Sequence, residues 1–250
     1  MTRDQHALRA LRAVDALGYF FALQVGATPD APPPNGLRPL RELYATGRDG
    51  SGPDAPLAAR IRLVGERLRT PEARVAASSV QFGIAARLLS VALGAVAFGG
   101  VLPDLDPDRA YARQPADGPL DLWVPYPQGA PARPVTAEQV HREVLLANLA
   151  PLGTAVRAIT PVAERLLWGN AASALVGTLR VLRGQPGAAH ATVAAVARQL
   201  LAREPLAGSS TWSPAFRRTT CCLYYRVPGG GLCGDCVFTT APGAATGARR

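Results

Sequence analysis

The feature that most constrains the fold is a long helical region that becomes more apolar along its length. Its second half, LLSVALGAVAFGGVL at 88–102, contains no charged residue and three glycines. The run is too short to span a bilayer comfortably. A helix that is apolar on all sides is typical of a protein core. We therefore expect a buried central helix that begins near Thr70-Pro71-Glu72, where threonine and proline form a helix start.

Shorter helical patterns lie on both sides of this region, and we expect helices over 3–26, 37–45, 57–68, 136–148, 160–182 and 189–204. LDLWVPY at 120–126 alternates apolar and polar residues and predicts a strand. The fold class expected is mainly α with a small β element (α+β). We expect a helical body over 1–204, a C-terminal cysteine segment over 205–238 and a disordered tail over 239–250.

The basic residues are all arginine, because the chain has no lysine among its 27 Lys and Arg positions. The missing lysine excludes P-loop NTPases and enzymes that use a Schiff-base lysine. No GxGxxG after a strand, GxSxG or HExxH motif is present either. The net charge of +9 is spread along the chain without a basic stripe, so we do not expect nucleic acid as a partner.

The N-terminal stretch MTRDQHALRALRAVDALGYF lacks the order of a signal peptide, because charges interrupt its apolar residues. We therefore expect a cytoplasmic protein with no integral membrane span; peripheral attachment at the inner face of the membrane is compatible with this. In that compartment cysteines serve metal or redox chemistry more often than structural disulfides.

All four cysteines lie in TTCCLYYRVPGGGLCGDCVF at 219–238, with the spacing CC-x10-C-x2-C. A disulfide between the adjacent pair would be strained. The second pair, CGDC, suits a zinc turn, whereas adjacent side chains diverge and converge poorly on one small ion. A two-iron cluster has a wider set of ligand positions, which favours iron–sulfur. Zinc remains open on these grounds.

The cysteine spacing and its place near the C-terminus resemble the signature of the FhuF-like ferric-siderophore reductase family. RLLWGNAASALVG at 165–177 and QFGIAARL at 81–88 resemble, more weakly, the helical body of the same family. The resemblance implies a [2Fe–2S] cluster on Cys221, Cys222, Cys233 and Cys236. It also implies a one-electron ferric-siderophore reductase with no catalytic residue beyond the cluster. Its partners would be a ferric siderophore and a separate electron donor, such as a ferredoxin or a reductase.

Three further residues are candidates for substrate binding. Trp168 and Asn170 lie in the WGNAAS part of the resemblance, and Arg226 follows the adjacent cysteines. Arg226, with Arg217 and Arg218, is also placed to raise the cluster potential or to dock an acidic donor.

Other functions compete with this reading. They are an iron–sulfur sensor or regulator and a zinc-stapled interaction module without catalysis. A domain of the siderophore synthetases also resembles the helical body, but those enzymes use ATP and this chain has no evident nucleotide motif.

Overall fold

The structure is a computed structural model that describes residues 2–45, 55–127, 133–212 and 215–242. It confirms the expected class, since helices dominate and the two sheets are small. The helices are α1 (Arg3–Asp15), α2 (Leu40–Leu43), α3 (Pro56–Arg67), α4 (Ala73–Gly99), α5 (Ala137–Val140), a π-helix (His141–Leu149), α6 (Ala150–Ile159), α7 (Glu164–Leu182), α8 (His190–Leu201) and a 3-10 turn (Tyr224–Arg226). The strands are β1 (Gln24–Val25), β2 (Arg38–Pro39), β3 (Tyr111–Arg113), β4 (Asp121–Val124), β5 (Ser210–Trp212) and β6 (Phe216–Arg218).

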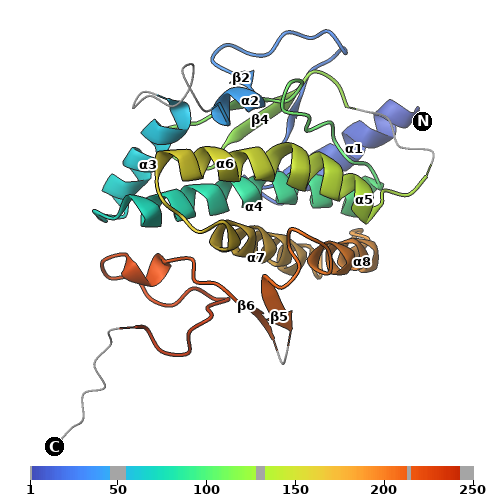
Figure 1. Cartoon of the computed structure of the whole chain (residues 1–250). Helices are drawn as coiled ribbons and strands as arrows, with labels where there is room; N and C mark the ends of the chain where they lie inside the picture. Colours follow the sequence, from blue (N-terminus) through green and yellow to red (C-terminus); the bar gives the residue numbers. More distant parts are fainter. Residues whose placement is uncertain (1, 46–54, 128–132, 213–214, 243–250) are drawn as a thin grey trace, which may run out of the picture.

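The central helix predicted from the apolar run is α4, and it packs against α1, α3 and α7. Most of its 27 residues are buried, including every residue from Leu88 to Ala97. Figure 1 shows α4 in the middle of the molecule, with α6 alongside it and α7 below. Because apolar neighbours surround α4, the burial of its side chains supplies a large share of the core.

The same helix is the one described helix that is long and apolar enough to cross a membrane by length and composition. Of its most apolar 18-residue window, 72% lies buried inside the protein. The prediction of a buried core helix is therefore confirmed. The helix begins at Ala73, with Glu72 as its N-cap, and Thr70 receives the Glu72 N–H on its hydroxyl at 3.3 Å.

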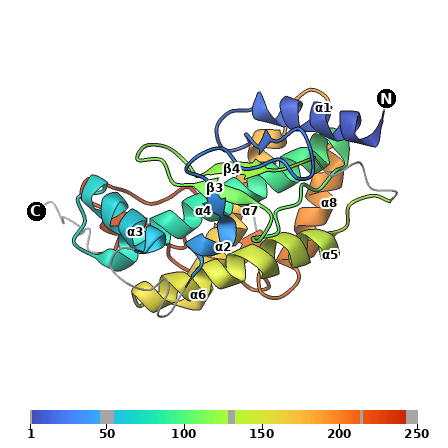
Figure 2. The same ribbon diagram turned by 90° about the horizontal axis from the view of Figure 1, so that it is seen from above.

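The small sheet has the strand order β1-β4-β3-β2 and lies on the α1 side of α4 (Figure 2). The predicted strand at 120–126 is β4, which pairs in parallel with β1 and antiparallel with β3. The buried guanidinium of Arg87 joins this sheet to α4, because it donates to the carbonyls of Leu120, Phe20 and Ala22. These three carbonyls give a buried cation the polar partners that it needs.

Two helix predictions in the N-terminal part were wrong in extent. The helix expected over 3–26 ends at Asp15, because Gly18 adopts a left-handed φ of 106° and the chain turns there before β1. The helix expected over 37–45 is reduced to α2, since residues 38–39 pair with β3 as a strand. Both errors arise because pairing between distant strands leaves no trace in local periodicity.

The helix predicted from the Thr136 capping box is present and longer than expected. Thr136 accepts the N–H of Gln139 at 3.2 Å, and the Gln139 side chain accepts the N–H of Thr136 at 3.0 Å. The chain then continues through the π-helix and α6 to Ile159. Within the π-helix, the buried Asn148 accepts a hydrogen bond from Tyr44 at 3.1 Å and so fixes α2 against the body.

The C-terminal segment lies below α7 in Figure 1, away from the β1–β4 sheet, and its 3-10 turn also contacts α4. It begins with the β5–β6 hairpin, in which Ser210 pairs with Arg218. The cysteines follow, and the chain runs on to 242. The boundary predicted at 204 stays a prediction, and residues 243–250 of the predicted tail lie outside the described residues.

Two glycines of α4 test how tightly this helix is packed. A Cβ built on Gly94 would lie 2.7 Å from Val14 Cγ1 of α1, whereas a Cβ on Gly83 meets nothing within 4 Å. Gly83→Ala is expected to raise the free energy of unfolding by about 0.5–1 kcal/mol, because alanine favours the helix. Gly94→Ala is expected to lower it by about 1–2 kcal/mol, because overpacking outweighs that gain. Urea denaturation followed by circular dichroism measures both, and equal effects of the two changes would contradict the close α1–α4 packing.

Candidate metal centre

The two halves of the cysteine motif are brought together by the β6 strand. Thr219 N, just after β6, donates to Ser209 O at 3.0 Å, and Arg218 N donates to Asp235 O at 3.0 Å. The CGDC turn therefore runs back beside the strand that precedes the adjacent cysteines. The rings of Tyr225 and Phe238, one after each half of the motif, meet edge to face at 5.8 Å. All four cysteines are free thiols, with Cys236 buried and the others half-buried.

Two of the cysteine sulfurs accept a hydrogen bond from the backbone N–H two residues further along the chain: Cys221 from Leu223 at 3.2 Å and Cys236 from Phe238 at 3.4 Å. The N–H groups at the same position after the other two cysteines, Tyr224 and Asp235, act to lower the pKa of Cys222 and Cys233. Such N–H···S contacts stabilise the thiolate, which is the form that binds metal. They also adjust the potential of an iron–sulfur cluster.

The backbone conformation of the cysteine segment allows its N–H groups to approach the sulfurs. Leu223, directly after the adjacent cysteines, adopts a left-handed φ of 69°, which is uncommon for a residue with a side chain. Gly230 lies so close to the preceding turn that a Cβ there would stand 2.9 Å from Val227 O and 3.0 Å from Tyr224 O. A side chain at 230 would therefore push the loop away from the turn that holds Cys222.

The sulfurs of Cys222 and Cys233 interact directly, so the two halves of the motif touch. A hydrogen bond between the two side chains lowers the pKa of Cys222 to about 6 and raises the pKa of Cys233. Burial raises the pKa of Cys221. The pair therefore favours one thiolate that is hydrogen-bonded to a neighbouring thiol. This arrangement is suited to a negatively charged metal group whose ligands are thiolates.

Within the described ranges, no group of three or more His, Cys, Asp and Glu side chains is placed to hold a metal ion. The cysteines instead form a direct pair, Cys222 and Cys233, with Cys221 and Cys236 close enough to interact with them electrostatically. A [2Fe–2S] cluster distributes four thiolates over two irons. The four-thiol donor set fits this cluster, and the assignment of Cys221, Cys222, Cys233 and Cys236 as its ligands stays a prediction.

A buried polar network joins the adjacent cysteines to α4 and α7. The Ser78 hydroxyl on α4 donates to Cys222 O at 2.8 Å. The amide of Asn170 on α7 donates to Ser78 O at 3.0 Å and to Gln81 Oε1 at 2.9 Å. Gln81 in turn donates to Leu167 O at 3.3 Å. The packing of the two core helices thus fixes where the Cys222 backbone lies.

A second contact fixes the CGDC turn on α7. The Ser173 hydroxyl donates to Asp235 Oδ2 at 2.7 Å. The Arg180 guanidinium lies 2.8 Å from Asp235 Oδ1, although it is not aligned for a hydrogen bond. The Asp235 side chain is 8% exposed, so this ion pair is less screened than a surface pair. Asp235 therefore holds Cys233 and Cys236 against the body of the protein.

Arg218 is a buried cation directly beside the thiols. It is 3% exposed, and its Nη2 donates to Leu166 O at 3.2 Å while its Nε has no partner in the described part of the chain. Burial lowers its pKa, and the opposing charges of Cys222, Cys233 and Cys221 act to raise it. A buried charge needs an opposite charge nearby. The thiolates of the metal centre provide that charge.

The room for Arg218 comes from a glycine of the WGNAAS stretch. A Cβ on Gly169 would lie 2.4 Å from Thr220 Oγ1 and 3.2 Å from Arg218 Nη2. Gly169 therefore lets the chain just before the cysteines approach α7 closely. The glycine of the WGNAAS stretch is therefore explained by the space that Thr220 and Arg218 need.

The three predicted substrate-binding residues lie in different surroundings. Asn170 is fully buried between α4 and α7, and Arg226 forms an ion pair with Glu72 at 2.7 Å. Trp168 is half-buried at the edge of α7, with its Nε1 3.5 Å from Glu164 Oε1. Substrate contact by these residues stays a prediction. The sequence analysis did not single out Ser78, Ser173, Arg180 or Asp235, although Asp235 lies inside the CGDC pair.

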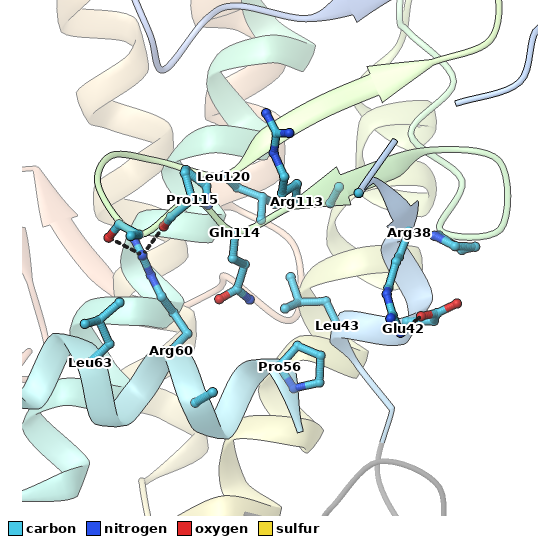
Figure 3. Close-up of a pocket in the computed structure, with 15 residues that line it drawn as sticks. Arg38, Glu42, Leu43, Pro56, Arg60, Leu63, Arg113, Gln114, Pro115 and Leu120 are labelled. Atoms are coloured by element: carbon cyan, nitrogen blue, oxygen red, sulfur yellow. Dashed lines mark hydrogen bonds and ion pairs between the residues drawn. The ribbon is translucent and has the colours of Figure 1, made fainter. Parts of the chain in front are cut away.

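The surface has several clefts, and they differ in how close they lie to the cysteine segment. A cleft of about 340 Å³ lies between α2, α3 and β3, with Gln114 at its centre and Arg38 and Arg60 at its sides (Figure 3). No residue of the cysteine segment lines it. Another cleft of about 370 Å³ lies between the first turns of α7 and the 204–209 stretch, and Trp168 lines it. The second cleft is the one next to the metal centre.

Comparisons of the structure with solved proteins give the fold of the body. Two structures of aerobactin synthetase IucA from a hypervirulent pathotype of Klebsiella pneumoniae match it, one of them with ATP bound. The TM-scores are 0.51 and 0.50, with 16% sequence identity in both cases. The matches cover 72% and 71% of this chain and 41% of each synthetase chain. At this identity the likeness shows a shared fold alone.

Comparisons of the sequence identify the cysteine segment. No curated protein matches the chain significantly. Residues 218–238 match the family model of the FhuF 2Fe-2S C-terminal domain. This range begins at Arg218 and contains all four cysteines. The resemblance is therefore confirmed where the cysteines lie: residues 218–238 are similar to the FhuF 2Fe-2S C-terminal domain and bind a [2Fe–2S] cluster.

Proposed function

We propose that this protein reduces ferric siderophores by one electron and so releases their iron in the cytoplasm. The observation that carries the proposal is the set of four thiols, two of which accept N–H···S hydrogen bonds, in a segment that matches the FhuF 2Fe-2S family model. The body adds support, because it shares the fold of an aerobactin synthetase, an enzyme of siderophore chemistry. The expected electron donor is a separate one-electron carrier protein.

The reaction needs few groups besides an electron source. Fe³⁺ is a hard cation that oxygen ligands hold tightly. One electron turns it into Fe²⁺, so the chelate loses affinity for the metal while its own bonds remain intact. When bound, the [2Fe–2S] cluster supplies that single electron. This step requires no proton transfer and no nucleophile.

The chain's own residues keep the electron source close to solvent. Cys221, Cys222 and Cys233 are half-buried, and the Gly229–Gly231 stretch is exposed. Tyr224 is 42% exposed on the same segment. A chelate and a donor protein can therefore each approach the segment without entering the helical body. The Asp235 and Ser78 contacts hold the segment in one position during these encounters.

The buried Arg218 sets the electrostatic environment of the centre. Reduction adds one negative charge beside a guanidinium that is 3% exposed and therefore little screened by solvent. The cation stabilises the reduced form more than the oxidised form, so it raises the midpoint potential. Arg226 is exposed and paired with Glu72, and its effect on the potential is expected to be small.

The function is tested with purified protein under anaerobic conditions. Protein reduced with dithionite and freed of excess reductant is mixed with ferric desferrioxamine B or ferric citrate. The expected result is reoxidation in the visible spectrum together with one trapped Fe²⁺ per electron, since the reaction moves single electrons. Cys233→Ser protein should lack the chromophore and give no reaction. Persistence of the reduced spectrum with both chelates would refute reductase activity, and colourless zinc protein would refute the cluster itself.

The role of Arg218 gives a separate prediction. Arg218→Gln is expected to lower the midpoint potential by about 100 mV, the order expected for a unit charge several Å away at an effective dielectric constant near 20. Redox titration followed by EPR measures the shift. Arg226→Gln is the matched control and is expected to leave the potential nearly unchanged. Equal potentials for wild type and Arg218→Gln, with iron content preserved, would contradict the electrostatic role.

A further inference from the structure

The cleft beside Trp168 is directly connected to the metal centre. Thr220 Oγ1 donates to Arg165 O at 3.2 Å on the α7 wall. On the opposite wall, Thr219 Oγ1 donates to Gly208 O at 2.8 Å and Thr219 N donates to Ser209 O at 3.0 Å. Thr219 and Thr220, the two residues that precede Cys221, therefore connect the two walls of the cleft to the cysteine segment. A molecule in this cleft would lie next to the cluster ligands.

The other clefts described lack this connection. The cleft shown in Figure 3 and an adjoining one of about 270 Å³ share Arg60, Gln114 and Leu120 and are lined by residues between 20 and 120. A further cleft lies on the α6–α7 connection, from Thr154 to Ala163. None of these is lined by a residue that hydrogen-bonds to the cysteine segment. The Trp168 cleft is thus the one with a short path to the electron source.

Two charged groups of the Trp168 cleft have no partner in the ranges that the structure describes. Neither the Arg165 guanidinium nor the Glu204 carboxylate takes part in an ion pair or side-chain hydrogen bond there, although both residues line the cleft and are exposed. Glu164, in contrast, is already paired with Arg157 at 2.9 Å. The cleft therefore offers one free cationic donor and one free anionic acceptor.

Part of the remaining lining is apolar and aromatic, and Ser209 adds a polar residue. The half-buried Trp168 and Pro205 form part of the lining, together with Ala207. An indole and a proline ring provide flat surfaces for an apolar part of a ligand. A volume of about 370 Å³ is within the range of small-molecule sites. The open cleft suits one lobe of a chelate that must leave again after reduction.

We propose that the Trp168 cleft is the docking site of the ferric siderophore, and that it selects siderophores whose outer face carries amide groups. An amide carbonyl accepts a hydrogen bond from Arg165, an amide N–H donates to Glu204, and the carbon chain lies on Trp168. This inference rests on the proposed reductase function and adds the substrate class and the place where it binds. It also assigns Trp168 to substrate contact and leaves Asn170 to the helix interface.

Binding is tested without electron transfer by using gallium(III) desferrioxamine B, a redox-inert complex that carries amide groups. Titration with holo-protein is expected to give a Kd that Arg165→Gln and Trp168→Leu each raise by about tenfold, since a charge-assisted hydrogen bond or a stacked face is lost. Gallium citrate, which has no amide groups, should bind more weakly to wild type. Arg198→Gln and Trp212→Leu, both exposed and outside the cleft, are the matched controls.

The reoxidation rate of reduced protein with ferric desferrioxamine B is measured on the same variants. It should fall in Arg165→Gln and Trp168→Leu while iron content and midpoint potential stay at the wild-type values. Equal Kd values and rates in wild type and cleft variants would overturn the docking site and leave the reductase function standing. Binding that depends on the cleft, without reoxidation of reduced wild type, would retain the site and overturn the reductase function.

Discussion

The arrangement of the metal centre depends on the buried contact between α4 and α7. These helices are mostly apolar, yet Ser78, Gln81 and Asn170 meet between them, where the Asn170 amide N–H donates to Ser78 and Gln81 while its Oδ1 has no partner among the described residues. Polar groups inside a core must find partners, so they allow one relative position of the two helices and penalise the others. Because Ser78 also donates to Cys222 O, that single position is passed on to the cysteine segment. The packing of α4 against α7 therefore also constrains the geometry of the metal centre.

The charged side chains around the cysteines are placed so that a cation faces the thiols and a carboxylate faces away from them. Arg218 is a buried cation next to the thiols. The Asp235 carboxylate points toward α7, where it forms an ion pair with Arg180. The negative charge of the carboxylate is therefore directed away from the sulfurs, and the positive charge of Arg218 is directed toward them. Gly169 is the residue that makes this distribution sterically possible, since a side chain there would displace Arg218 and Thr220.

Local patterns in the sequence predicted much of this structure. The apolar run predicted α4, the capping box at Thr136 predicted α5, and the resemblance of the cysteine motif to the FhuF-like family predicted the kind of metal group. The parts that were missed depend on contacts between distant residues. The early end of α1 follows from a left-handed glycine, and the short strands β1 and β2 follow from pairings with residues about 70 to 100 positions away. Asp235 was overlooked because its partners Ser173 and Arg180 are about 60 residues away and carry no spacing signal.

The N–H···S hydrogen bonds have a further consequence for how such a protein can arise. Each of these N–H groups lies two residues from its sulfur, so the segment itself carries part of the environment of every cysteine. The body contributes the side chains that fix the position of the segment, among them Ser78, Ser173 and Arg180. A segment of this kind could therefore be joined to another helical body only where that body supplies equivalent contacts.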